Sequence, residues 1–188
     1  QVVSRALDHH ASDDGAAATA VEGASAAHTR NGVRMHPERT IRRSVIGSGH
    51  GLHTAVRSGL ILYPLPPGRG IVFTNLSTGA SVPAHLEFVE STGYATTLHQ
   101  GDMSVATVEH LLATLHAYGI TNVLVKVQSE VPVMDGSARD FCALIESAGI
   151  QEQGGGVEEI TVDRRISVGS DDAEEEGISI EPADTLTI

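Results

Sequence analysis

The sequence predicts an α+β fold, a two-layer sandwich of a mostly antiparallel sheet packed on helices, over residues 38–153. Short β-rich runs separated by glycine and proline turns fill the first part of this region. The apolar period then switches, and Val108, Leu111, Leu112 and Leu115 recur at helical spacing. A strand-like alternation and a second apolar helix follow. The order of strands, helix, strand and helix is typical of an α+β domain.

The first half of this region supplies the predicted sheet. The run RTIRRSVIGSGHGLHTAVRSGLILYPLPPGRGIVFTN is interrupted at residues 47–49 (GSG) and at the proline-rich residues 64–70. We therefore expect a strand, a glycine turn, a strand, a proline turn and a further strand. SVPAHLEFVE and YATTLH add two strand candidates, followed by a turn at residues 100–102.

Two helices and one strand complete the expected domain. The first helix ends at Gly119, and NVLVKVQ then alternates as a strand. The second helix covers residues 138–148 and ends at Gly149. The single cysteine, Cys142, lies inside this helix, so we expect it to be buried and inert. One cysteine excludes an internal disulfide and a cysteine-rich zinc site.

Both ends of the chain differ in character from the domain. Residues 1–37 are rich in Ala, Ser and Asp without apolar periodicity, which predicts a disordered leader. An organellar targeting peptide is the alternative, although such peptides are normally poor in acidic residues. Residues 154–156 (GGG) resemble a linker, and residues 154–188 then alternate like strands around an acidic turn. Because a lone hairpin is marginal in water, we expect these to be the first strands of an incomplete second domain.

Charge and hydropathy exclude two classes of partner. The chain has 188 residues and a formal net charge of −12, which argues against binding to nucleic acid. No apolar run reaches the about 18 residues of a membrane span, so we expect no stable membrane insertion. These features predict a soluble protein, and we expect it to be cytoplasmic.

An acidic residue and a histidine stand side by side where the first helix begins. Free N–H groups and the positive dipole end there favour a carboxylate at Glu109 and keep the imidazole of His110 neutral. A neutral imidazole can bind zinc, and a neighbouring carboxylate can accept a proton. The structural alternative is a carboxylate that stabilises the helix dipole beside a half-buried histidine. His116 lies about 240° further round the helix and cannot share an ion with His110.

Other polar motifs also have two interpretations. In GHGLH, His50 and His53 follow a glycine turn and either face a cleft or are plain turn residues. In MDGSA, Gly136 favours a turn, Ser137 a helix cap and Asp135 a turn acceptor. Four histidines in the predicted leader are expected to be exposed and to have no functional role: His9, His10, His28 and His36.

Taken together, these motifs resemble one enzyme family. GHGLHT, LYPLPPGRGIVF, SVATVEHLLATLHAYGITNVLVKV and SEVPVMDGSARDF have the order and spacing of the amino-terminal domain of UDP-3-O-acyl-N-acetylglucosamine deacetylases, zinc enzymes of lipid A biosynthesis. The resemblance implies two similar α+β domains packed around one active site. It implies Glu109 as general base, His110 as a zinc ligand and His53 as a substrate-binding residue at the mouth of the site. The implied reaction hydrolyses the N-acetyl group of UDP-3-O-acyl-N-acetylglucosamine.

The chain also departs from the family pattern. The resemblance implies two further zinc ligands, a His and an Asp in an H-K-x-x-D pattern of the second domain, but no His-Lys pair occurs here. Ala55 also stands where a glycine usually follows GLHT. We therefore expect this chain to need the missing second domain and to be inactive alone. The alternatives are a non-catalytic module that binds a nucleotide sugar or a protein, and an enzyme of two separately encoded chains.

Overall fold

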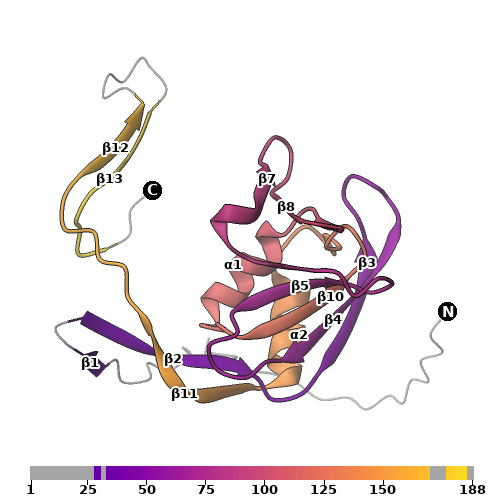
Figure 1. The fold of residues 1–188 in the computed structure, drawn as a ribbon, viewed down its shortest axis with the longest axis horizontal. Helices are drawn as coiled ribbons and strands as arrows, with labels where there is room; N and C mark the ends of the chain where they lie inside the picture. The colour runs from indigo at the N-terminus through magenta and orange to yellow at the C-terminus, as the bar shows by residue number, and fades with distance from the viewer. Residues whose placement is uncertain (1–27, 31–32, 170–176, 186–188) are drawn as a thin grey trace, which may run out of the picture.

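The computed structural model describes residues 28–30, 33–169 and 177–185, and Figure 1 shows a mixed fold of sheets and two helices. Its largest sheet has five strands in the order β3–β4–β10–β5–β6. Only the β10–β5 pair is parallel. The bounds are Val45–His50 (β3), Arg57–Pro64 (β4), Ile71–Asn75 (β5), Ser81–Pro83 (β6) and Val123–Val127 (β10). The expected mostly antiparallel sheet is confirmed.

The described residues also form three smaller sheets. The first, β7–β8–β9, follows a single turn of 3₁₀ helix at Leu86–Phe88 and comprises Val89–Ser91, Thr97–Gln100 and Met103–Val105. The second, β1–β2–β11, joins His28–Arg30, Val33–Ile41 and Ile150–Glu158. The third is the hairpin of β12 (Ile166–Gly169) and β13 (Gly177–Ile180), which stands apart from the other strands in Figure 1.

The helices α1 (Glu109–Ala117) and α2 (Arg139–Ala148) share one core with the five-stranded sheet. Along β10, three buried valines alternate with the half-buried Leu124 and Lys126, because successive side chains of a strand face opposite sides of its sheet. Both helices end as the sequence predicts: Gly119 and Gly149 adopt positive φ angles of 65° and 71° beyond their last turns. The core members are Leu60, Leu62, Phe73, Leu111, Leu115, Val123, Val125, Val127, Phe141 and Ile145, among others.

The predicted glycine turn at residues 47–49 is wrong, because these residues lie inside β3. A Cβ atom at Gly47 would lie 2.8 Å from Cδ1 of Leu144 on α2. At Gly49 it would lie 2.9 Å from the sulfur of Met134. The glycines therefore let α2 and the preceding loop approach the strand closely, which local sequence patterns do not reveal.

Two expected boundaries also differ from the structure. The predicted linker at residues 154–156 lies inside β11, which pairs with β2 as far as Glu158 and shifts register after Glu152. Strands β1 and β2 begin within the predicted leader, so regular structure starts before residue 38. The rest of that leader, residues 1–27 and 31–32, lies outside the described residues. Cys142 lies in α2 as expected but is half-buried rather than buried.

Neither helix in the described part of the chain is long and apolar enough to cross a membrane.

Truncating the largest side chain that α2 places in the core should destabilise the protein. Phe141 is fully buried, so Phe141→Ala is expected to lower the free energy of unfolding by about 3–5 kcal/mol. Urea unfolding followed by circular dichroism measures this change. Tyr94→Ala is the matched control, because Tyr94 is 96% exposed and its removal should cost less than about 0.5 kcal/mol. Equal effects of the two substitutions would contradict the packing described here.

Candidate functional site

Glu109 and His110 are the first two residues of α1, and both side chains are half-buried rather than part of the core. The backbone N–H of Thr96, just before β8, donates a hydrogen bond of 3.2 Å to Oε2 of Glu109. The carboxylate therefore reaches from the helix start to the segment between β7 and β8. This contact adds a tertiary partner to the favourable interaction of an acid with a helix N-terminus.

His110 keeps both ring nitrogens available within the described part of the chain. Its backbone carbonyl accepts a hydrogen bond of 2.8 Å from the hydroxyl of Thr114, one helical turn further on. Its imidazole forms no hydrogen bond or ion pair with a described residue. A neutral imidazole whose ring nitrogens have no hydrogen-bond partner can bind a metal ion through either of them.

His53 lies in the loop of residues 51–56 between β3 and β4, and its side chain is exposed. Two backbone hydrogen bonds close the loop, from Gly51 to Val56 and from Ala55 back to Gly51. Ala55 has a φ of 53°, a left-handed conformation that favours glycine. Ala55 therefore has a backbone conformation that suits the glycine usually found after GLHT.

A cavity of about 310 Å³ lies between this loop and the β7–β8–β9 sheet. Glu109 and His110 are not among its lining residues. Glu109 nevertheless lies at its border, because Thr96, which binds the carboxylate, stands between two lining residues. The structure therefore brings His53 and Glu109 to one region but does not place His110 on the cavity wall. The wall is formed by His53, Thr54, Ser91, Tyr94, Ala95, Thr97, Ala106, Ser129 and Glu130.

Glu130 is a member of this wall that the sequence analysis missed. Its side chain is 3% exposed, and its carboxylate accepts hydrogen bonds from the loop that carries His53 and from the hydroxyl of Thr107. Burial raises the pKa of Glu130, but these hydrogen bonds outweigh it and hold the pKa below its ordinary value. The stability that the ionised carboxylate contributes is therefore present at neutral pH and is lost as the pH falls through the lowered pKa.

The described residues do not form a complete metal site. Among them, no group of three or more His, Cys, Asp or Glu side chains is placed to hold a metal ion. A catalytic zinc ion normally has three protein ligands. His110 offers one unengaged imidazole, with the Glu109 carboxylate beside it on the same helix. These donors suit zinc in kind but not in number, so no catalytic step through a metal follows from this chain alone.

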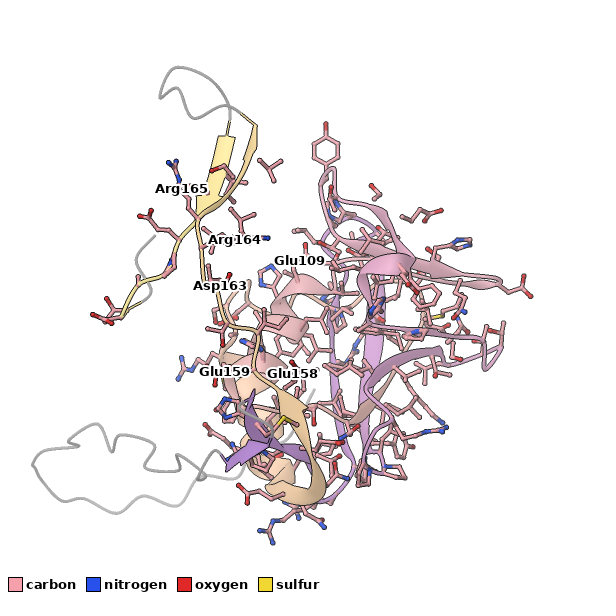
Figure 2. The ribbon with its side chains drawn as sticks, turned by 60° about the vertical axis from the view of Figure 1, so that its left-hand side comes forward. Glu109, Glu158, Glu159, Asp163, Arg164 and Arg165 are labelled. Atoms are coloured by element: carbon pink, nitrogen blue, oxygen red, sulfur yellow. The ribbon has the colours of Figure 1, made fainter. Side chains whose placement is uncertain are left out.

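A second and larger cavity, of about 670 Å³, lies at the other end of α1, where His116, Glu158 and Glu159 contribute to its lining. Figure 2 shows Glu109 well apart from Glu158 and Glu159. His36, expected to be idle, also lines this cavity, and its Nε2 lies 2.9 Å from Oε2 of Glu159. His36 therefore helps to hold β2 against the segment that follows β11.

The MDGSA motif has the structural role that its residue types suggest. Oδ1 of Asp135 accepts hydrogen bonds from the backbone N–H and the hydroxyl of Ser137, and these lower the pKa of Asp135. The Ser137 hydroxyl oxygen accepts a hydrogen bond of 3.2 Å from the N–H of Arg139, the first residue of α2. Gly136 has a φ of 86°, as the predicted turn requires.

Comparison with known proteins identifies the family. The family described as UDP-3-O-acyl N-acetylglycosamine deacetylase matches residues 38–188. Relatives named UDP-3-O-acyl-N-acetylglucosamine deacetylase come from Myxococcus xanthus, Teredinibacter turnerae and Coxiella burnetii. The chain is 46% identical to the first over 70% of its own length and 43% of the relative's. It is 44% identical to the second over 71% of its own length and 45% of the relative's. It is 38% identical to the third over 79% of its own length and 49% of the relative's. The chain thus spans about half the length of these relatives. It belongs to the UDP-3-O-acyl-N-acetylglucosamine deacetylase family.

Proposed function

We propose that this chain is the first half of a zinc-dependent deacetylase of lipid A biosynthesis. The complete enzyme hydrolyses the N-acetyl group of UDP-3-O-acyl-N-acetylglucosamine. The observation that carries this proposal is the family match across residues 38–188, which includes the half-buried Glu109 and His110 at the start of α1. The names of the relatives support the same substrate.

Each of three residues has a separate role in this proposal. Glu109 acts as general base, since its carboxylate is half-buried at a helix start and lies at the border of the cavity. His110 is one ligand of a zinc ion, which when bound supplies Lewis-acid polarisation of the acetamide carbonyl. His53 contacts the substrate from the cavity wall, where its imidazole is exposed and the loop backbone is held by Glu130.

The second half of the enzyme supplies the remaining zinc ligands in this proposal. Two observations support a missing half: the relatives are about twice as long as the region matched, and the described residues offer zinc only a partial ligand set. We place the first domain within residues 33–158, because β2 begins at Val33 and pairs with β11 as far as Glu158, and we assign the following strands to the second domain.

The β12–β13 hairpin carries an apolar face that suits burial by this second domain. Ile166 pairs with Ile180 and Val168 with Ile178, so all four side chains lie on one face. They are between 51% and 69% exposed. A two-stranded hairpin is marginal in water without such a cover. The rest of the second domain is therefore the expected occupant of this face.

Because this apolar face is exposed, the chain alone is expected to self-associate. Replacing Val168 and Ile178 together by serine should shift the chain toward monomer, as measured by sedimentation equilibrium. The control replaces Ser167 and Ser179 by alanine, because this pair lies on the opposite face and should leave association unchanged. A monomeric unsubstituted chain at the same concentration would count against the exposed face as a docking surface.

Acetate release tests the proposed activity. The comparison uses the chain alone and a joined protein, in which the chain continues into the unmatched second half of the Myxococcus xanthus relative. We expect acetate from UDP-3-O-acyl-N-acetylglucosamine only with the joined protein. Activity of the chain alone would contradict the need for a second half. An inactive but folded joined protein would favour the alternative, a non-catalytic module that binds a nucleotide sugar or a protein.

A cytoplasmic location accords with a nucleotide-sugar substrate and remains a prediction, as does an organellar targeting role for the leader of residues 1–37.

A further inference from the structure

We infer that Glu130 is a positioning residue, which fixes the loop that carries His53 against the start of α1. This inference rests on the proposed substrate-binding role of His53. Glu130 follows β10 by three residues, and its carboxylate is buried between the loop of residues 51–56 and Thr107. It therefore connects two segments that the chain separates by about fifty residues.

The carboxylate receives hydrogen bonds on both oxygens. Oε1 accepts from the backbone N–H of His53 at 2.9 Å and from the hydroxyl of Thr107 at 3.2 Å. Oε2 accepts from the backbone N–H of Thr54 at 3.1 Å and from its hydroxyl at 2.6 Å. Two backbone N–H groups and two hydroxyls surround the carboxylate, and the ionised form can accept a hydrogen bond from all four.

The backbone on both sides of the carboxylate is shaped to receive it. A Cβ atom at Gly51 would clash with Oε2 of Glu130, so the close approach requires glycine there. Thr107 is buried and has a φ of 59°, which threonine rarely adopts. Such a conformation persists where surrounding contacts hold it, and the hydrogen bond to Glu130 is one of them.

These contacts link the loop to the proposed catalytic helix. Thr107 stands two residues before Glu109, and Ala106 forms a backbone bridge with Glu130. The same carboxylate thus holds the loop of His53 on one side and the segment entering α1 on the other. It thereby fixes the separation of the proposed substrate-binding residue and the proposed base.

Amide hydrogen exchange of the chain, followed by mass spectrometry, tests this inference. In Glu130→Gln the amide nitrogen cannot accept a hydrogen bond, so one pair of donors is left unsatisfied. We expect exchange within residues 51–56 to accelerate by roughly tenfold to a hundredfold. Exchange within β10 should change by less than about twofold, because the core is untouched. Glu87→Gln, at an exposed glutamate, is the matched control.

A second pair of variants decides the question if Glu130→Gln does not fold. Thr54→Val removes the 2.6 Å hydrogen bond and should accelerate exchange of the loop, whereas Thr54→Ser keeps the hydroxyl and should restore protection. Unchanged loop exchange in Glu130→Gln or in Thr54→Val would overturn the inference. Equal acceleration in the loop and in β10 would also overturn it, because it would indicate a general contribution to stability alone.

The joined protein tests whether the fixed loop matters for the reaction. If Glu130 acts through His53, the double variant His53→Ala/Glu130→Gln should lose no more kcat/KM than His53→Ala alone. Losses that multiply would indicate independent roles and contradict the inference. Failure of the proposed function can be told apart from failure of this inference. If the proposed function is wrong, the joined protein and all its variants lack activity, but amide exchange still reports whether Glu130 holds the loop.

Discussion

Glu109→Gln in the joined protein is expected to lower kcat by about 10²–10⁴-fold, the usual contribution of a positioned general base. Glutamine keeps the size of the side chain and an oxygen that can accept the 3.2 Å hydrogen bond from Thr96. It cannot take a proton from the attacking water at neutral pH. KM should change little, because the substitution removes an interaction made in the transition state. Acetate release at saturating substrate measures kcat.

The matched control for this experiment is again Glu87→Gln, an exposed position in the 3₁₀ helix. It should leave kcat unchanged. A Glu109→Gln protein with near-normal kcat would show that Glu109 only stabilises the start of α1. That outcome would favour the structural alternative for the adjacent acid and histidine.

His110→Ala in the joined protein should remove zinc and activity together. His110 is proposed as one of three protein ligands, and its imidazole has no other hydrogen-bonding role among the described residues. Elemental analysis should find near-stoichiometric zinc in the unsubstituted joined protein and almost none in the variant. Circular dichroism should report an unchanged fold, because the side chain is half-buried and outside the core.

His99→Ala is the control, since His99 is exposed on β8 and lies outside the proposed ligand set. It should keep both zinc and activity. Retention of zinc by His110→Ala would contradict its role as a ligand, whatever its effect on kcat.

Much of the fold follows from local patterns in the sequence. Apolar residues at helical spacing predicted α1 and α2, and alternation predicted β10, because each of these elements buries one side. The glycine-rich residues 47–49 and 154–156 predict a turn and a linker, whereas the structure places them within β3 and β11. At Gly47 and Gly49 glycine makes room for distant side chains, and only the folded structure shows which side chains arrive there.

The candidate site could be predicted in part. The adjacent Glu109 and His110 at a helix start are a local signal, and the resemblance gave them their proposed roles. Glu130 carried no such signal, since a single acid within SEVPV has the appearance of a loop residue. Its hydrogen bonds reach His53 and Thr54, which precede it by more than seventy residues. Contacts of this range depend on the complete fold rather than on local periodicity.

The central claim is that α1 presents one part of a zinc site, completed by residues from a second half of the enzyme. Zinc content after dialysis against a weak chelator tests it most directly, with the chain alone compared with the joined protein. We expect the joined protein to retain close to one zinc ion per molecule and the chain alone to retain almost none. Stoichiometric zinc on the chain alone would contradict the claim, because its own residues would then suffice to hold the ion.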